Sequence, residues 1–466
     1  MSSHVESIRH SCALHGALDA VQAVEGAVAV LHATSGCGVQ RYLAGGAARS
    51  GGSGYAGGLA TPSTNVGERH VVFGGTSRLR EQLKNAVRVM RGDLYVVISG
   101  CAPELVGDDA DAMVREVRDQ GYPVLSISAP GFKGLAHQGH QVAVKALLGL
   151  LAPAAAPERT RGRVNVLGIV PGQDATWRGD LVEIKALLAG IGVEAATLFG
   201  VGEGLDAWRR AAAAELNLSF SPWGDEIARH LEKVHGTPHL SFPGLPIGPD
   251  AAGALLGRVG ERLALDPSRI AAVRAREETR FHGYLEAAAD AILAHGLQRE
   301  FAFVGPASLA AGVTGFLAGV GLAPTAVVVT DVKEEVGLPA LSEALGRIVP
   351  ELSDVVYFGE DGSEIADLLR ERRPELLVGS GLERSVARDL GVPLLEVAGP
   401  VRDRLILGRS YVGDRGGVAL IEDLSREILS ADLAADVTAR GRLAVASVAE
   451  PPITTAAYAA TQEQRT

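Results

Sequence analysis

All three cysteines of this 466-residue chain lie within its first 101 residues. They occur in the segments Ser-Cys12-Ala-Leu-His-Gly, Ser-Gly-Cys37-Gly and Ser-Gly-Cys101-Ala-Pro. Each has a glycine beside it or within a few residues, so the backbone can come close to a metal, and cysteine thiolates are the usual ligands of iron–sulfur clusters. We therefore interpret Cys12, Cys37 and Cys101 as iron–sulfur ligands. The alternative is that they are small buried apolar residues, as most free cysteines are.

The surroundings of Cys101 have the clearest pattern. Leu94-Tyr-Val-Val-Ile-Ser99 is typical of a buried parallel strand, and residues 103–118 are typical of a helix. Cys101 is then expected at the carboxyl end of a strand and just before a helix, where amide N–H groups favour an anion. Residues 17–33 predict a helix that runs into a buried strand ending at Gly36-Cys37. Residues 71–75 suggest the end of another strand.

Strands and helices alternate along the rest of the chain, which favours parallel sheets covered by helices. We predict an α/β fold of three Rossmann-like domains, with residues 1–158 carrying the cysteines. The other expected units are a middle domain at 159–296, a C-terminal domain at 297–440 and a disordered tail at 441–466. We also expect an irregular loop at residues 41–65 and a helical segment at 211–218. A helix at 270–295 is expected to bridge two domains, and a last helix is expected at 416–430.

Composition excludes several classes of function. The formal charge of −11 with no basic run argues against nucleic acid or an anionic membrane as a partner. No apolar run approaches the ~18 residues of a spanning helix, and there is no signal peptide, so we expect a cytoplasmic protein with reduced thiols. The sequence contains no P-loop motif, so we do not expect this chain to hydrolyse ATP itself. No glycine-rich segment completes a dinucleotide-binding fingerprint after a strand. His137 and His140 are expected on a solvated helix face rather than on zinc.

A set of longer motifs resembles the nitrogenase component 1 family, and the resemblance spans residues 8–430. The motifs are Cys12 with His15-Gly16, Ser-Gly-Cys37-Gly, Glu68-Arg-His-Val-Val-Phe-Gly-Gly75, Ser-Gly-Cys101-Ala-Pro-Glu-Leu-Val-Gly-Asp-Asp109, Val164-Asn-Val-Leu-Gly168, Gly179-Asp-Leu-Val-Glu-Ile-Lys185, Gly236-Thr-Pro238 with Pro246-Ile-Gly248, and Asp403-Arg404 through Gly416.

The resemblance implies an α/β heterodimer, usually paired into an α2β2 heterotetramer, that receives electrons from a separate ATP-hydrolysing iron protein. In the family each subunit holds the interface P-cluster with three cysteines, and Cys12, Cys37 and Cys101 match them. Three thiolates cannot complete a four-coordinate cubane, whereas three from each of two chains can enclose an 8Fe-7S cluster. The odd count thus predicts an α-type partner. A 4Fe-4S cluster is also possible.

The resemblance also indicates a β-type subunit. The family's catalytic subunit holds its metal cofactor with a middle-domain cysteine and a C-terminal histidine. Here those positions fall near Ser219-Phe-Ser221 and Val412, and no cysteine follows Cys101. Two features depart from the β chain of molybdenum nitrogenase. Only eleven residues precede Cys12, and Gly131 takes the place of a serine that can ligate the oxidised P-cluster.

These departures point to an electron-relay subunit of a nitrogenase-like reductase, with methylthio-alkane reductase favoured and nitrogenase proper next. The cysteine-triplet subunit of dark-operative protochlorophyllide reductase stays open. A different class of function is a scaffold on which a nitrogenase-type cofactor is assembled. The presence of all three cysteines favours the enzyme, because a scaffold's β-type chain commonly lacks some of them. No catalytic residue is identified.

Overall fold

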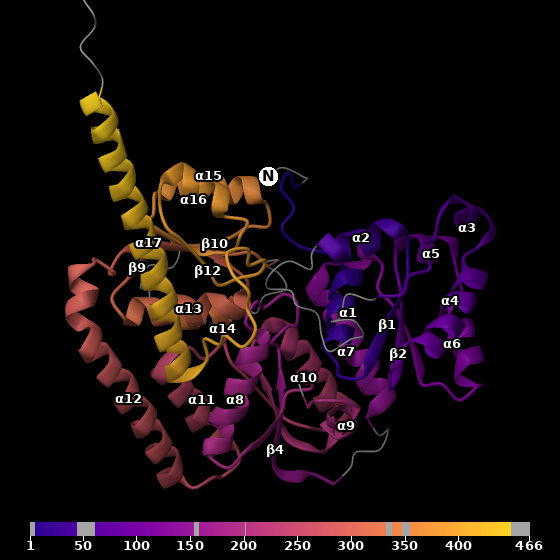
Figure 1. Cartoon of the computed structure of the whole chain (residues 1–466). Helices are drawn as coiled ribbons and strands as arrows, with labels where there is room; N and C mark the ends of the chain where they lie inside the picture. The colour runs from indigo at the N-terminus through magenta and orange to yellow at the C-terminus, as the bar shows by residue number, and fades with distance from the viewer. Residues whose placement is uncertain are drawn as a thin grey trace, which may run out of the picture.

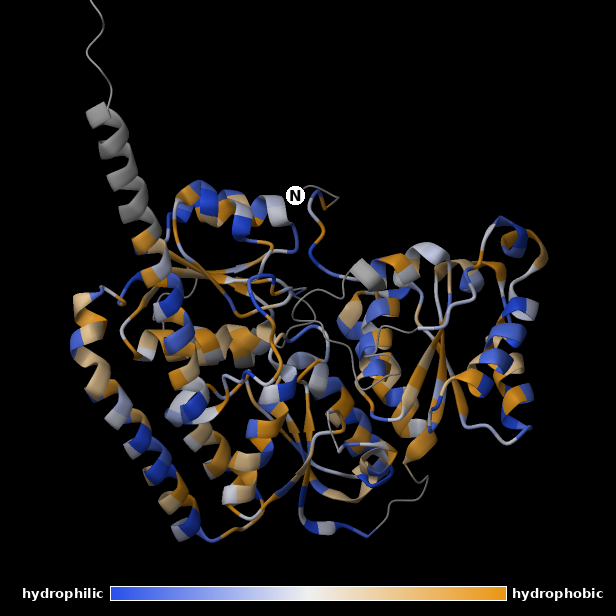
Figure 2. Cartoon of the chain, in the orientation of Figure 1, coloured by the Kyte–Doolittle hydropathy of each residue, from blue (hydrophilic) through white to orange (hydrophobic). Residues whose placement is uncertain are grey.

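A computed structural model describes residues 5–43, 61–152, 158–200, 202–331, 338–346 and 355–448. It contains three parallel sheets, each covered by helices, and confirms the predicted α/β class (Figure 1). One sheet lies within each of the three predicted domain ranges, while the exact domain boundaries stay a prediction. The strands at the centre of the units are largely apolar (Figure 2).

The N-terminal sheet has the strand order β1-β2-β3. Its strands are β1 (Ala27–His32), β2 (Leu94–Ser99) and β3 (Val124–Ser128). Successive residues of a strand point to opposite faces, so Val96 packs with α1 (Ala13–Gln22) and α7 (Ala136–Leu151), whereas Val97 packs with α4 (Thr76–Val89) and α6 (Ala110–Arg118). Both faces are covered, which explains the uninterrupted apolar run that predicted β2.

The middle sheet has the order β5-β4-β6-β7. Its strands and the helices around it are β4 (Thr160–Leu167), β5 (Glu194–Ala196), β6 (Ala214–Ser219), β7 (His239–Ser241), α8 (Trp177–Gly190), α9 (Leu205–Arg209), α10 (Pro222–His235) and α11 (Gly248–Arg262).

The C-terminal sheet has the order β10-β9-β8-β11-β12. One face packs on α13, and the other on α15 and α16. The elements are β8 (Glu300–Gly305), α13 (Ala307–Gly319), β9 (Ala323–Val329), α14 (Leu338–Gly346), β10 (Val356–Phe358), α15 (Gly362–Arg372), β11 (Leu376–Gly379), α16 (Arg384–Leu390) and β12 (Leu394–Glu396).

Two long helices connect the middle and C-terminal domains. The predicted bridge is α12 (Pro267–Ala294), which leads from one domain to the other. The last helix, α17 (Gly413–Val448), packs against both α11 and α12 (Figure 1). It is longer than predicted, and it extends into the range expected to be a disordered tail. Within the described part of the chain, no helix has both the length and the apolar character needed to cross a bilayer.

Several local predictions were wrong. The strand expected to end at Gly36-Cys37 ends at His32, and Cys37 lies in helix α2 (Ser35–Leu43). Residues 71–75 are not a strand end, because α3 (Glu68–Phe73) occupies most of that segment and leaves its apolar side chains exposed. The predicted helix 103–118 is two helices, α5 (Cys101–Val106) and α6, separated where Gly107 adopts a left-handed conformation with φ of 75°.

The segment 211–218 was predicted helical from its alanines and is mostly strand. After a short 3₁₀ turn at Ala211–Ala213, β6 runs between β4 and β7, and Leu216 and Leu218 are completely buried. Tertiary burial therefore outweighs local helix propensity here. Residues 44–60, most of the predicted irregular loop, lie outside the described part of the chain.

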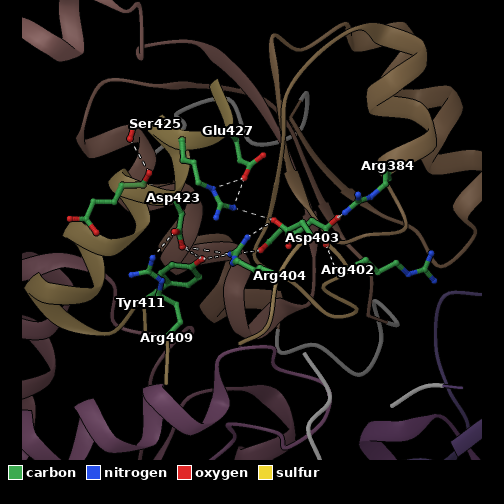
Figure 3. Close-up of polar contacts among 12 residues, drawn as sticks. Arg384, Arg402, Asp403, Arg404, Arg409, Tyr411, Asp423, Ser425 and Glu427 are labelled. Carbon is green, nitrogen blue, oxygen red and sulfur yellow. Dashed lines mark hydrogen bonds and ion pairs between the residues drawn. The ribbon is translucent and has the colours of Figure 1, made fainter. Parts of the chain in front are cut away.

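A buried carboxylate ties the C-terminal segment to the middle domain. Asp180 in α8 accepts hydrogen bonds from the Ser410 hydroxyl (2.8 Å) and the Tyr411 amide (3.0 Å). Burial raises the pKa of Asp180 to about 7. Tyr411 in turn donates to Asp423 of α17, and Arg404 bonds to both Tyr411 and Asp403 (Figure 3). These polar contacts hold the segment before α17 against the rest of the structure.

Candidate functional site

The three cysteines lie on one edge of the N-terminal sheet, at the ends of three separate helices. Cys12 is the N-cap residue of α1, Cys37 lies in the first turn of α2 after β1, and Cys101 is the first residue of α5 after β2. The expected position of Cys101, at the carboxyl end of a strand and the start of a helix, is confirmed. In a parallel sheet the carboxyl ends of neighbouring strands meet at the same edge, which brings Cys37 and Cys101 together.

Gly131 is the residue around which two of the cysteines meet. It begins the short 3₁₀ turn Gly131–Lys133 that follows β3. A Cβ placed on Gly131 would lie 3.3 Å from the sulfurs of both Cys12 and Cys101, and 3.1 Å from Cys12 Cβ. The Gly131 amide donates a hydrogen bond to Cys101 Sγ at 3.1 Å. A larger residue would crowd both thiols, so the glycine leaves the space between them open.

His15 connects Cys12 with Cys37. Its Nδ1 lies 3.3 Å from Cys12 Sγ, and its Nε2 lies 3.3 Å from the Cys37 carbonyl oxygen. The side chain is buried, which fixes the ring between the two segments. In the sequence, His15 stands out only as part of a motif with Cys12. The available signal for a contact was the spacing of three residues between Cys12 and His15, because residues three apart lie on the same side of a helix.

The thiols differ in acidity. Burial raises the pKa of the Cys12 thiol, but the hydrogen bond and charge of His15 lower it by more, so the net pKa is lowered. Burial lowers the pKa of His15, and Cys12 more than offsets this, so the net pKa is raised. Burial raises the pKa of Cys37, the contact with Thr34 lowers it in part, and the nearby charges of Cys12 and Cys101 raise it further. All three thiols therefore interact electrostatically within one site.

The site opens to the surface. Cys101 is exposed, and Cys12 and Cys37 are half-buried, which does not fit the interpretation of three buried apolar residues. Large apolar side chains beside the site are also exposed, and we call them the apolar rim. The rim comprises Val39 on α2, Leu105 on α5 and Phe132 after Gly131, with exposed fractions of 56%, 74% and 57%.

A second polar cluster supports the cysteine edge from behind. The buried His32, at the end of β1, lies 3.2 Å from Asp108 through its Nε2. Asp108 also accepts hydrogen bonds from the Gly75 amide (2.7 Å) and the Thr76 hydroxyl (3.2 Å), which join the end of α5 to the start of α4. Burial lowers the pKa of His32 and Asp108 raises it in part, with a net lowering. No pattern in the sequence indicates this role of His32.

The positions expected to match the family's cofactor ligands take part in internal packing. Ser219 donates a hydrogen bond to the Ser221 carbonyl at 3.0 Å, and Ser221 caps α10. Val412 is buried next to Ile247. The prediction of solvated histidines was wrong, because α7 packs against α10 and both His137 and His140 are buried. His137 stacks on Trp223 at 3.6 Å, and burial lowers the pKa of His140 to about 3.

Among the described residues, no three His, Cys, Asp or Glu side chains are grouped so that they could hold a single metal ion. At the cysteine edge, the sulfurs of Cys12 and Cys101 lie beside Gly131, and His15 connects Cys12 with the segment that carries Cys37. In a comparison with known protein families, the sequence model of the nitrogenase component 1 type oxidoreductases matches residues 12–429 of this chain. The match runs from the first cysteine to α17.

The chain belongs to the nitrogenase component 1 family. It is a β-type member and a subunit of an oxidoreductase. The nitrogenase molybdenum-iron protein beta chain of Methanococcus maripaludis is 25% identical over 90% of this chain and 93% of the relative. The corresponding chain of Methanothermobacter thermautotrophicus is 27% identical over 78% and 83%.

Two further matches extend the comparison within the nitrogenase component 1 family. The nitrogenase iron-molybdenum cofactor biosynthesis protein NifE of Bradyrhizobium diazoefficiens is 25% identical over 90% of this chain and 74% of the relative. The solved structure described as nitrogenase Cp1 at pH 6.5 superposes with a TM-score of 0.74 at 20% identity, covering 92% of this chain and 94% of that one. This likeness shows the same fold.

The contact between His15 and Cys12 can be tested through thiol chemistry. Replacement of His15 by Ala removes the hydrogen bond and the positive charge, so the pKa of the Cys12 thiol is expected to rise and its alkylation at neutral pH to slow. Mass spectrometry of the chain alkylated over a pH series follows each cysteine separately. His70→Ala, on the neighbouring helix α3, is the matched control. An unchanged pH profile for Cys12 in His15→Ala would contradict the contact.

Proposed function

We propose that this chain is the electron-transfer subunit of a nitrogenase-like reductase and holds half of an iron–sulfur cluster with Cys12, Cys37 and Cys101. The observation that carries the proposal is that Cys12 and Cys101, from separate helices, meet at Gly131 on an exposed edge, while His15 connects Cys12 with the segment that carries Cys37. When bound, such a cluster supplies one-electron transfer between an ATP-hydrolysing iron protein and a cofactor in the partner subunit.

The residues at this edge fit such a group in their chemistry. Thiolates are the ligands that iron–sulfur clusters use, and the lowered pKa of Cys12 favours its thiolate form. The Gly131 amide already donates to Cys101 Sγ, and amide donors of this kind stabilise negative charge on a cluster's sulfurs. We propose a cluster of the P-cluster type with 8Fe-7S composition, which the resemblance to the nitrogenase component 1 family implies, with a 4Fe-4S cluster as the simpler form.

A second chain is required because three sulfurs leave a cluster incompletely ligated. We propose an α-type homologous subunit that covers the exposed side of Cys101 and forms a heterodimer, paired into an α2β2 heterotetramer. The apolar rim supports this interface, since exposed apolar side chains that gather around one site mark a surface for association. An iron protein would dock across the two subunits. We place the assembly in the cytoplasm, where thiols stay reduced.

Gly131 favours a reductase related to nitrogenase over nitrogenase itself. It has no side-chain oxygen that could approach iron when the cluster is oxidised, and a side chain there would meet Cys12 and Cys101. The residues at the cofactor-ligand positions are packed inside the chain, so the reducing cofactor belongs to the partner. Methylthio-alkane reductase is the named candidate, ahead of nitrogenase and the cysteine-triplet subunit of dark-operative protochlorophyllide reductase.

The second candidate function is a scaffold for cofactor assembly. The similarity to NifE over 90% of this chain favours it, because that relative is a cofactor biosynthesis protein. The three cysteines favour the electron-transfer subunit. The two functions differ in turnover, since a scaffold transfers a cofactor without reducing a substrate.

Removal of one thiol tests the ligand assignment. Cys37→Ala is expected to abolish most iron binding and visible absorbance in the complex with its natural partner, because a sulfur ligand is lost at a site that has no spare thiol. The fold should persist, since Cys37 lies at the edge of the core. Ser35→Ala, two residues away on the same helix, is the matched control and should retain iron. Equal iron content in Cys37→Ala would refute ligation.

A charge on the apolar rim tests the interface. Leu105→Asp places a carboxylate in the expected contact and should weaken association with the α-type subunit by more than about tenfold, since an unpaired buried charge is costly. Size-exclusion chromatography of the co-expressed subunits measures the effect. Val234→Asp, on the exposed side of α10 in the middle domain, is the control. Normal heterodimer formation by Leu105→Asp would place the interface elsewhere.

Turnover separates the enzyme from the scaffold. The purified complex, supplied with its iron protein and ATP, is expected to reduce a small substrate such as a methylthio-alkane, and hydrolysis of ATP should accompany product formation. Gas chromatography measures the product, and omission of ATP is the control. Transfer of a metal cofactor to another protein without any ATP-dependent reduction would favour the scaffold instead.

A further inference from the structure

The first described residues of the chain lie against the C-terminal domain, although they lead into the N-terminal one. Residues 6–11, which we call the N-terminal strap, belong to no helix or sheet strand and end directly before Cys12. The segment runs from beside α15 to α1 (Figure 1). A stretch of only a few residues therefore connects the C-terminal domain to a proposed cluster ligand.

Asp361 anchors the start of the N-terminal strap. Its carboxylate is buried and accepts hydrogen bonds from the amides of Glu6 (2.8 Å) and Ser7 (3.1 Å). The Gly362 amide donates to the Ser7 carbonyl at 3.0 Å. Asp361 also caps α15, because it accepts a hydrogen bond from the Ser363 amide at 2.8 Å. One carboxylate thus holds both the strap and the first turn of a C-terminal helix.

Two further anchors lie closer to the cysteine. The Arg9 guanidinium forms an ion pair with Glu383 at 2.6 Å, and the exposed fractions of the two side chains are 7% and 2%. Glu383 is itself held by the amide and the hydroxyl of Ser380, each at 2.8 Å. His10 Nε2 donates to the Thr330 carbonyl at 2.6 Å. The ion pair resists opening, because separating a buried pair leaves an uncompensated charge.

Cys12 stands at an end of α1 that lacks a side-chain cap. It is the N-cap residue, and its side chain accepts no hydrogen bond from the first turn. The Ala13 amide donates instead to the Gly134 carbonyl at 2.9 Å. The first amides of a helix have no partner within the helix, and helix ends fray. The strap therefore restrains Cys12 from the side on which α1 offers no hydrogen bonds.

Cys37 and Cys101 are positioned differently from Cys12. They follow β1 and β2 and are held by the N-terminal sheet itself. Cys12 precedes every element of that sheet and is preceded only by the strap. At about 3.3–3.6 Å per residue, the three residues from Arg9 to Cys12 span at most ~11 Å, so there is little slack between the ion pair and the thiol.

We propose that the N-terminal strap positions Cys12, so that Arg9 and Glu383 are positioning residues for one ligand of the iron–sulfur cluster. The consequence at the cluster rests on the proposed function, whereas the restraint on the thiol rests on the contacts of the strap alone. The C-terminal domain thereby acts on the geometry of the cysteine edge without contributing a sulfur to it.

The strap can be tested on the full-length chain without iron. Arg9→Met removes the guanidinium and keeps much of the stem. Hydrogen exchange of the amides at residues 13–16 and alkylation of Cys12 at one fixed pH should both accelerate about three- to tenfold, because the first turn of α1 opens more often. Cys37 and Cys101 should react at unchanged rates. Arg9→Lys, which restores a charge opposite Glu383, should recover most of the protection. Mass spectrometry measures both reactions.

The matched control is Arg409→Met, which breaks an ion pair of 2.7 Å with the buried Asp423 in the segment before α17 and should leave Cys12 unchanged. In the complex with the natural partner, Arg9→Met should retain iron but shift the electron paramagnetic resonance signal of the cluster, whereas Arg409→Met should not. If circular dichroism shows that Arg9→Met is unfolded, Asp361→Asn is measured instead, since asparagine also caps a helix.

Several outcomes would overturn the proposal. They are unchanged exchange and alkylation at Cys12 in the folded variant, equal acceleration of all three cysteines, failure of Arg9→Lys to restore protection, and an unshifted cluster signal. An iron-free complex of the original chain would count against the proposed function instead, and the thiol measurements would then decide whether the strap positions Cys12.

Discussion

The site depends on close approach of the backbone to two sulfur atoms at Gly131. The sulfurs of Cys12 and Cys101 come from different helices, and a side chain of any size at Gly131 would compete with them for space. Its amide also donates directly to Cys101 Sγ. This one position thus sets the separation of the thiols and supplies a donor to one of them, while His15 connects Cys12 to the segment that carries Cys37.

Parallel topology brings these residues together from distant parts of the sequence. β1, β2 and β3 are adjacent and end at the same edge, so the segments that follow them carry Cys37, Cys101 and Gly131 to one place. α1 lies across the same sheet and brings Cys12 to this edge. The His32–Asp108 cluster then fixes the ends of β1 and α5 behind the thiols.

Sequence patterns predicted the elements that are buried on both faces. Residues 94–99 form β2 as expected, because a fully covered strand needs an uninterrupted apolar run. The position of Cys101 followed directly from it. The pattern failed where tertiary packing opposed local propensity. The alanine-rich segment before Ser219 became β6 between two other strands, and the apolar residues up to Phe73 lie exposed on a short helix.

The polar residues of the site were harder to predict. His137 and His140 look like a solvated pair, yet the contact between α7 and α10 buries them, and no local pattern reveals a contact between helices so far apart in sequence. The role of His32 depends on Asp108, 76 residues away. Long-range contacts of this kind require the structure.

The most direct test of the central claim is the position of iron in the purified complex of this chain with its natural partner. Anomalous diffraction at the iron absorption edge locates the metal without assumptions about function. The account predicts iron beside Gly131, within bonding distance of the sulfurs of Cys12, Cys37 and Cys101 and shared with the second chain. An iron-free complex, or iron bound away from these three sulfurs, would contradict it.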